Sequence, residues 1–235
     1  MTEAEDSLIL PKDIDSRSTV EAVRTRLEKK QGGAEFSITL GDITEADVDA
    51  IVCPSNPGLE FAGFGGVQLA ISKKSGMETF QEAERKAQEY VRTTGGVASD
   101  EGLRGVPLGF ASATTAGELR RIKSIIHVNS MRSERGKSPC DEEVVRLSVS
   151  SALTEADRAG LKSVAFPAIG TGIWGMSLEE SLRGTVQGVK DHFDAQPDSK
   201  VEKATFVVYA PATSENARSL QETLFNRVLL SFSKK

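Results

Sequence analysis

The chain has 235 residues, of which 38% are hydrophobic and 27% are charged, a composition typical of a soluble globular protein. Its formal net charge of −5 at pH 7 argues against broad, charge-driven nucleic-acid binding, which requires clustered lysine and arginine. Two cysteines are too few for a disulfide framework or a zinc site. We expect neither a metal nor a cofactor. The sequence has no long apolar run, and its acidic first residues lack a signal-peptide pattern, which predicts no contact with a membrane and a cytoplasmic protein, or a nuclear one in a eukaryote.

The first part of the chain is predicted to be an N-terminal extension, residues 1–33, and residues 34–235 a single domain. Ser18 and Glu21 make a capping-box pattern before apolar residues that share one helical face, which predicts a helix over residues 19–30. Because a helix this short is only marginally stable alone, we expect it to dock on the rest of the protein.

Strands and helices alternate beyond residue 33, with no linker and no internal repeat. The predicted strands are residues 34–40, 49–53, 106–115, 124–130, 163–169 and 203–210. The predicted helices are residues 66–75, 78–92, 141–159, 177–195 and 214–231. This alternation predicts one α/β sandwich with a mostly parallel sheet and helices on both faces.

The stretch from residue 163 to residue 175 carries the clearest chemical signal. An apolar strand breaks there into Gly170-Thr-Gly-Ile-Trp-Gly175, and a helix follows near Ser177. Glycine lets the backbone approach an anion closely, and a helix N-terminus adds partial positive charge, so this pattern predicts a phosphate-binding loop. For one glycine loop alone, a tight turn without a ligand is the alternative. In α/β sheets ligands lie beyond the carboxyl ends of the strands, and three other strand ends also carry unusual residues.

Five motifs then stand in one order along the chain. They are Gly41-Asp-Ile-Thr44, Asp49-Ala-Ile-Val-Cys-Pro-Ser-Asn56, Gly65-Gly-Val67, Ile125-Ile-His127 and the stretch from Phe166 to Gly175. Their residues and spacing resemble the macro domain family of ADP-ribose-binding modules. The resemblance implies a three-layer α/β/α sandwich around a mixed, mostly parallel sheet. It also implies a cleft for ADP-ribose, or for an ADP-ribosylated protein, across the strand ends.

The resemblance assigns roles to single residues at three strand ends. Asp42 corresponds to the acid that accepts a hydrogen bond from the adenine amino group, with Ile43 beside the base, and Tyr209 corresponds to an aromatic residue that packs against adenine. Asn56 corresponds to the residue that binds the distal ribose, and it is the candidate catalytic residue. Each role has a structural alternative, because Asp and Asn also cap turns and a Tyr can cover the end of a sheet.

Two glycine loops are expected to hold the diphosphate, mostly through backbone N–H groups. Their residues are Gly65, Gly66 and Val67 in the first loop, and Gly170, Thr171, Gly172, Ile173 and Trp174 in the second. Trp174 is expected to close over the distal ribose, with a core-filling Trp as the alternative. Outside these loops, we expect His127 and Cys53 to be core residues and His192 to lie on the surface.

Gln68 is the departure that matters most for activity. The most active hydrolases of the family carry an Asp there, and a carboxylate can activate water as a general base whereas an amide cannot. Gly170 also replaces the usual Ser, and Phe64 replaces a glycine. We therefore expect ADP-ribose binding, with metal-independent hydrolysis of mono-ADP-ribosyl linkages that is weaker than in those members. A non-catalytic reader of ADP-ribose, and a module for another nucleotide or for a protein partner, are the alternatives.

Overall fold

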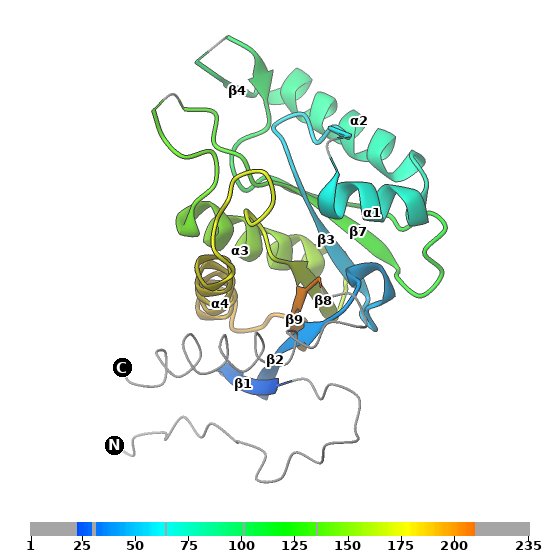
Figure 1. Cartoon of the computed structure of the whole chain (residues 1–235), viewed down its shortest axis with the longest axis vertical. Coiled ribbons are helices and arrows are strands. Elements are labelled where there is room, and N and C mark those ends of the chain that lie inside the picture. Colours follow the sequence, from blue (N-terminus) through cyan, green and yellow to red (C-terminus); the bar gives the residue numbers. More distant parts are fainter. Residues whose placement is uncertain (1–22, 30–31, 64, 101, 135, 210–235) are drawn as a thin grey trace.

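The computed structural model describes residues 23–29, 32–63, 65–100, 102–134 and 136–209. In this part of the chain, seven strands form one mixed sheet with the order β1-β2-β9-β8-β3-β7-β6 (Figure 1). They are β1 (Val23–Lys29), β2 (Gly32–Leu40), β3 (Ala50–Ser55), β6 (Ala111–Thr115), β7 (Ser124–Asn129), β8 (Ser163–Pro167) and β9 (Lys203–Val208). The five inner strands are parallel, and β1 and β6 are antiparallel to their neighbours. A hairpin of β4 (Val97–Ala98) and β5 (Arg104–Gly105) stands apart.

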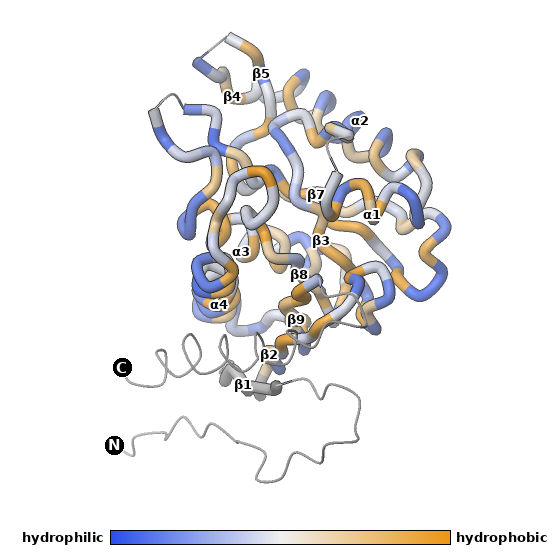
Figure 2. Tube along the Cα trace, viewed as in Figure 1, coloured by the Kyte–Doolittle hydropathy of each residue, from blue (hydrophilic) through white to orange (hydrophobic). Residues whose placement is uncertain are grey.

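Helices cover both faces of this sheet, which confirms the predicted three-layer sandwich. They are α1 (Gly66–Ser75), α2 (Glu78–Thr94), α3 (Glu142–Arg158), α4 (Leu178–Ala195) and a short 3-10 helix, η1 (Ile43–Glu45). Alternate residues of β3 enter two cores: Ala50 and Val52 pack in the α3 and α4 layer, and Ile51 and Cys53 pack on the α1 and α2 side. Hydrophobic residues gather in the middle of the sheet, and the outer turns of α2 and α4 are hydrophilic (Figure 2). None of the described helices could span a membrane.

Residues 23–29 form a strand, so the predicted helix over residues 19–30 is wrong across this segment. β1 pairs antiparallel with β2, from Val23 opposite Ile38 to Lys29 opposite Gly32. The reason is tertiary, because pairing with β2 joins this segment to the sheet, whereas a lone helix of this length is only marginally stable. This pairing joins residues on both sides of the expected boundary at residue 33. The division into an N-terminal extension, residues 1–33, and a domain, residues 34–235, stays a prediction. The capping residues Ser18 and Glu21, and the helix predicted over residues 214–231, lie outside the described residues.

The strand predicted over residues 106–115 is shorter than expected. β6 begins at Ala111, because the chain turns before it and Phe110 N donates to the carbonyl oxygen of Pro107 (3.0 Å).

The hairpin of β4 and β5 contacts the loop that follows β3. At its base, Val106 N donates to the carbonyl oxygen of Pro57 (2.8 Å). Gly105 allows this approach, since a Cβ on it would lie 2.6 Å from the Pro57 side chain. The hairpin is thereby anchored on the loop that follows β3.

Two glycines of α4 set the close packing of α3 on α4. A Cβ on Gly184 would lie 2.8 Å from the carbonyl oxygen of Glu142, and one on Gly188 would lie 2.5 Å from that of Arg146. Any side chain at these positions would push the helices apart, because real Cβ atoms do not approach other atoms so closely. The start of α4 is therefore held firmly against the start of α3.

The outer edge of β6 is covered by charged side chains from the helices on both faces. Glu155 of α3 accepts a hydrogen bond from Ala113 N (3.0 Å), and Glu82 of α2 accepts one from Thr115 N (3.0 Å). Lys86 of α2 donates to the carbonyl oxygen of Ala113 (2.5 Å) and pairs with Glu82 (2.8 Å). An edge strand with free N–H and C=O groups is a template for another strand, and here side chains occupy those groups.

Candidate functional site

Four parallel strands bring the predicted site residues to one edge of the sheet. β2, β9, β8 and β3 are consecutive neighbours, so their carboxyl ends share an edge. Gly41 N donates to the carbonyl oxygen of Val208 (2.9 Å), which places Asp42 beside Tyr209. Asn56 follows β3, three strands away, and neighbouring strands are about 4.8 Å apart. The predicted residues thus lie along an edge about 14 Å long, with the second glycine loop between them.

The two carboxylate oxygens of Asp42 differ: one caps η1, and the other is available to a ligand. Its Oδ1 accepts hydrogen bonds from Thr44 N (2.9 Å) and Thr44 Oγ1 (2.7 Å), which caps η1 as the turn interpretation predicts. Oδ2 has no hydrogen-bond partner among the described residues, and the side chain is only half-buried. Ile43 is buried, and Tyr209 is 75% exposed. One acceptor and one exposed ring therefore lie side by side at the ends of β2 and β9.

Asn56 uses its amide to close its own loop. Its Oδ1 accepts hydrogen bonds from Gly58 N (2.9 Å) and Glu60 N (3.2 Å), and its Nδ2 donates to the carbonyl oxygen of Glu60 (3.2 Å). The structure therefore shows the turn role of this residue. One N–H of the amide remains for a ligand hydroxyl, because Nδ2 carries two hydrogens.

Gln68 holds the same loop from α1. Its Oε1 accepts a hydrogen bond from Ala62 N (3.2 Å). Its Nε2 lies 3.3 Å from the carbonyl oxygen of Pro54 and 3.4 Å from that of Glu60. This combination needs an amide, since a carboxylate accepts hydrogen bonds but cannot donate them. Sequence reasoning missed this role because the partners are backbone atoms outside α1.

The first glycine loop leads into α1 without a side-chain cap. Gly65 is the N-cap residue with φ +103°, and Gly66 has φ +62°, a region that favours glycine. A Cβ on either would meet nothing within 4 Å, so the loop borders open space. The first N–H groups of a helix have no partners within that helix. The start of α1 therefore has N–H groups that a ligand could use, and the binding role of residues 65–67 stays a prediction.

The second glycine loop presents free N–H groups at its tip. Met176 N donates to the carbonyl oxygen of Gly170 (3.1 Å) and closes the loop at its base. The N–H groups of Gly172, Ile173 and Trp174 have no hydrogen-bond partner in the described part of the chain. Successive backbone N–H groups without partners are the kind of donors that bind anions in proteins.

The start of α4 contributes less than expected. Ser177 and Glu180 form a complete capping box, so side chains of the helix itself already occupy donors of its first turn. Thr171 Oγ1 donates to the carbonyl oxygen of Ala168 (2.8 Å), which fixes the first half of the loop. At the start of α4, the N–H groups of Ser177 and Glu180 are thus already paired within the helix, whereas those at the loop tip are not.

The macro domain family matches residues 54–184, which is more than half of the chain. The chain belongs to the macro domain family. A protein of Aquifex aeolicus is 35% identical over 157 residues, covering 66% of this chain and 81% of that protein. One of Saccharolobus solfataricus is 31% identical over 202 residues, covering 86% and 98%. One of Thermotoga maritima is 35% identical over 181 residues, covering 77% of this chain but only 27% of that protein's length.

Solved macrodomains share the fold of this macro domain. A mutant of the Oceanobacillus iheyensis macrodomain with ADPR matches with a TM-score of 0.67 and 20% identity, covering 90% of this chain and 100% of that chain. The Trypanosoma brucei macrodomain in complex with ADP-ribose matches with a TM-score of 0.59 and 17% identity, covering 83% and 68%. At these identities the comparison establishes the fold.

Trp174 of this macro domain is 39% exposed, so the core-filling alternative is wrong. It lines a cleft of about 490 Å³ between residues 138–143 and residues 174–180, together with Cys140, Asp141, Met176 and Glu180. The ring therefore borders open space next to the free N–H groups.

The two histidines are both buried. His127 lies in β7, packs edge-to-face on Phe80 at 5.0 Å between ring centroids, and neither ring nitrogen has a partner among the described residues. Burial lowers its pKa to about 4, which confirms a neutral core residue. His192 contradicts the expected surface position: it is 1% exposed and its Nε2 lies 3.0 Å from Asp157 Oδ2. Its helix face packs towards α3, so a polar residue there needed a partner.

Cys53 is buried as predicted, and burial raises the pKa of its thiol far above the ordinary value. A neutral thiol is a poor nucleophile. The described residues contain no group of three or more His, Cys, Asp or Glu side chains that could hold a metal ion.

Proposed function

We propose that this macro domain binds ADP-ribose across the carboxyl ends of β2, β9, β8 and β3. The observation that carries the proposal is the set of three free N–H groups at Gly172, Ile173 and Trp174, on the same edge as Asp42 and Asn56. Backbone donors hold phosphate groups even in a protein of net charge −5. The solved macrodomains with ADPR or ADP-ribose give the proposal further support.

Each part of the ligand has a partner of suitable chemistry in this arrangement. Oδ2 of Asp42 accepts from the adenine amino group, and the exposed ring of Tyr209 packs beside the base. The diphosphate lies between the start of α1 and the tip of the second glycine loop. Asn56 donates its remaining N–H to the distal ribose, and Trp174 covers that ribose from the side of its cleft.

Hydrolysis of mono-ADP-ribosyl linkages is the second candidate function, and the position of Asn56 beside the phosphate donors favours it. Water then forms a bond to the anomeric carbon while the bond from that carbon to the acceptor breaks, and the proton that water loses ends on the acceptor. No protein carboxylate at position 68 can take that proton on the way, because Gln68 is an amide occupied with its own loop. The phosphate of the ligand would hold and orient that water. We expect such turnover to be slow, since a positioned general base typically contributes about 10²–10⁴-fold to the rate.

Isothermal titration with ADP-ribose tests the binding proposal. Asp42→Asn keeps an Oδ1 acceptor for η1 but replaces Oδ2 by a donor, so we expect at least about tenfold weaker binding. Gly172→Glu places a carboxylate at the three N–H groups and should abolish binding. Asp47→Ala, an exposed residue of the same connection, is the matched control. Absence of binding by the wild-type protein, or full affinity of Gly172→Glu, would contradict the proposal.

A turnover assay separates a hydrolase from a reader. A mono-ADP-ribosylated protein is incubated with excess macro domain, and released ADP-ribose is measured. Release that disappears in Asn56→Ala supports the hydrolase, whereas binding without release identifies a reader. A thermal-shift panel with unrelated nucleotides tests the remaining alternative, because a specific ligand stabilises the native state by mass action. Stabilisation by another nucleotide and not by ADP-ribose would replace our proposal.

A further inference from the structure

The segment between β7 and α3 lies against the base of the second glycine loop. Cys140 of this segment is 2% exposed, and its Sγ would lie 2.9 Å from a Cβ placed on Gly170. Met176 Sδ would lie 2.2 Å from the same point. Two sulfur-containing side chains therefore fill the space that a side chain at Gly170 would need. A displacement of Cys140 would leave the base of the loop without support on that side.

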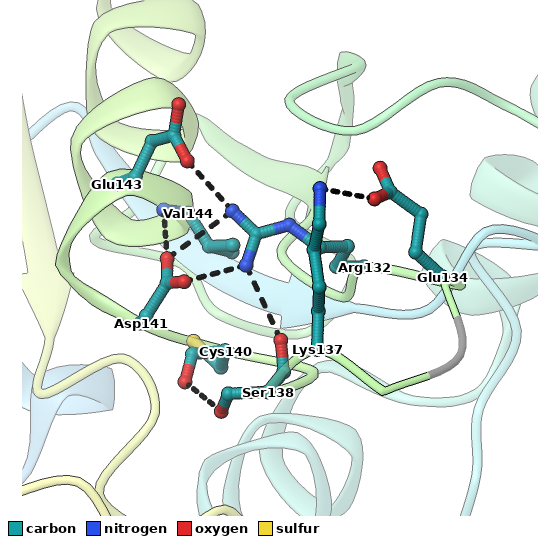
Figure 3. A network of polar contacts seen from close by, with 8 residues as sticks. All are labelled: Arg132, Glu134, Lys137, Ser138, Cys140, Asp141, Glu143 and Val144. Atoms are coloured by element: carbon teal, nitrogen blue, oxygen red, sulfur yellow. Dashed lines mark hydrogen bonds and ion pairs between the residues drawn. The ribbon is translucent and has the colours of Figure 1, made fainter.

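Arg132 fastens this segment through its guanidinium group (Figure 3). Its side chain is 8% exposed, and it donates to both carboxylate oxygens of Asp141 (2.5 and 3.4 Å). It also donates to Glu143 Oε2 (2.8 Å) and to the carbonyl oxygen of Ser138 (3.3 Å). The N–H of Arg132 donates to the carbonyl oxygen of Pro139 (2.8 Å). One nearly buried residue thus contacts the chain on both sides of Cys140.

The guanidinium is suited to this role. Its planar fork binds a carboxylate through two N–H groups, which an ammonium group cannot reproduce. Partial burial opposes ionisation of Asp141, but Arg132 and the N–H of Val144 hold the pKa of that carboxyl below its ordinary value. Asp141 Oδ1 also caps α3 through Val144 N (3.0 Å), so this cap would persist without Arg132. Removing the Arg132 side chain would therefore loosen residues 138–140 and leave Asp141 and the start of α3 in place.

We infer that Arg132 is a positioning residue for the second glycine loop: it fixes Cys140 against Gly170 and so holds the free N–H groups of residues 172–174 in place for a phosphate group. The inference rests on the proposed function. Asp42 and Tyr209 lie at the ends of other strands, so the adenine end of the site does not depend on Arg132. Loss of Arg132 therefore weakens binding of the diphosphate and leaves recognition of adenosine unchanged.

The binding test compares Arg132→Met with Arg132→Lys. The matched control is Arg146→Met, because Arg146 of α3 pairs with Asp191 of α4, away from the loop. We expect Arg132→Met to weaken ADP-ribose binding about tenfold, within the range that packed networks transmit between sites. Arg132→Lys should weaken it less, and Arg146→Met not at all. Adenosine binding, followed by ligand-observed NMR, should be the same in all four proteins.

Thiol labelling gives a second readout that needs no ligand. Iodoacetamide labelling of Cys140 and Cys53 is followed by peptide mass spectrometry, with the fully buried Cys53 as the internal control for global unfolding. We expect Arg132→Met to accelerate labelling of Cys140 alone. In the wild-type protein ADP-ribose should slow it, because coupling between two sites is reciprocal.

Two results would overturn the inference. One is an Arg132→Met protein that binds ADP-ribose as tightly as the wild type does. The other is labelling of Cys140 and Cys53 that rises in parallel, because this would mean that Arg132 stabilises the whole domain and not the loop. A wild-type protein that does not bind ADP-ribose would instead overturn the proposed function, and labelling of Cys140 without ligand would still decide whether Arg132 holds this segment.

Discussion

Substituting Gly170 by alanine should destabilise this macro domain strongly. The backbone at Gly170 has φ +85°, and a residue with a Cβ in the left-handed region costs about 1–2 kcal/mol. The new methyl group would lie 2.2 Å from Met176 Sδ and 2.9 Å from Cys140 Sγ. Overpacking of this kind costs about 1–3 kcal/mol. We therefore expect a loss of about 2–5 kcal/mol in the free energy of unfolding.

Urea denaturation followed by far-UV circular dichroism measures this loss. Gly172→Ala is the matched control in the same loop, because nothing lies within 4 Å of its Cβ position and we expect a change within about 0.5 kcal/mol. Adding Met176→Ala to Gly170→Ala removes the closer clash, so the two effects should couple favourably by about 0.5–3 kcal/mol. Equal stability of Gly170→Ala and Gly172→Ala would refute the close packing of Met176 and Cys140 against Gly170.

Three further outcomes are expected. Gly188→Ala should lower the melting temperature by several degrees in calorimetry, because its Cβ would meet the Arg146 carbonyl oxygen, whereas Lys190→Ala on the exposed side should not. His127 has a folded pKa of about 4, below the ordinary value of about 6.5, so the unfolded state takes up its proton first as the pH falls. Urea unfolding should therefore show stability lost progressively from about pH 6.5 to pH 4, by roughly 3 kcal/mol in total, and His127→Leu should flatten this profile. Removing Glu82 and Glu155 together should produce concentration-dependent association in size-exclusion chromatography, and Glu89→Ala, an exposed residue of α2, should not.

Local sequence signals predict the elements whose ends are marked by glycine or by caps. α1 begins at Gly66 and ends before Gly76, and both bounds are readable from the sequence. The sequence of β1 favours a helix because Val23 and Leu27 suit a helical face, yet they are also compatible with alternation in a strand. Pairing with β2 decides between the two, and such a contact between strands is invisible in one segment of sequence.

The candidate site is predictable as a set of strand ends but not as a set of contacts. Asn56 fits both a turn and a ribose, because one amide serves either purpose, and the structure shows the turn. The sequence shows that Gln68 stands where the most active family members have an acid. It does not show that Gln68 hydrogen-bonds the backbone of the loop after β3. No sequence pattern marks Arg132 as important, because its partners Asp141 and Glu143 come close to it only in the folded chain.

The covered edge of β6 limits how this macro domain can meet another polypeptide. A peptide that joined the sheet by β-augmentation there would have to displace Glu155, Glu82 and Lys86 from the backbone groups that they occupy. The edge of β6 is therefore protected against pairing with a strand of another polypeptide. Under the proposed function, an ADP-ribosylated partner would be recognised through its modification at the strand ends and not through its main chain at the β6 edge.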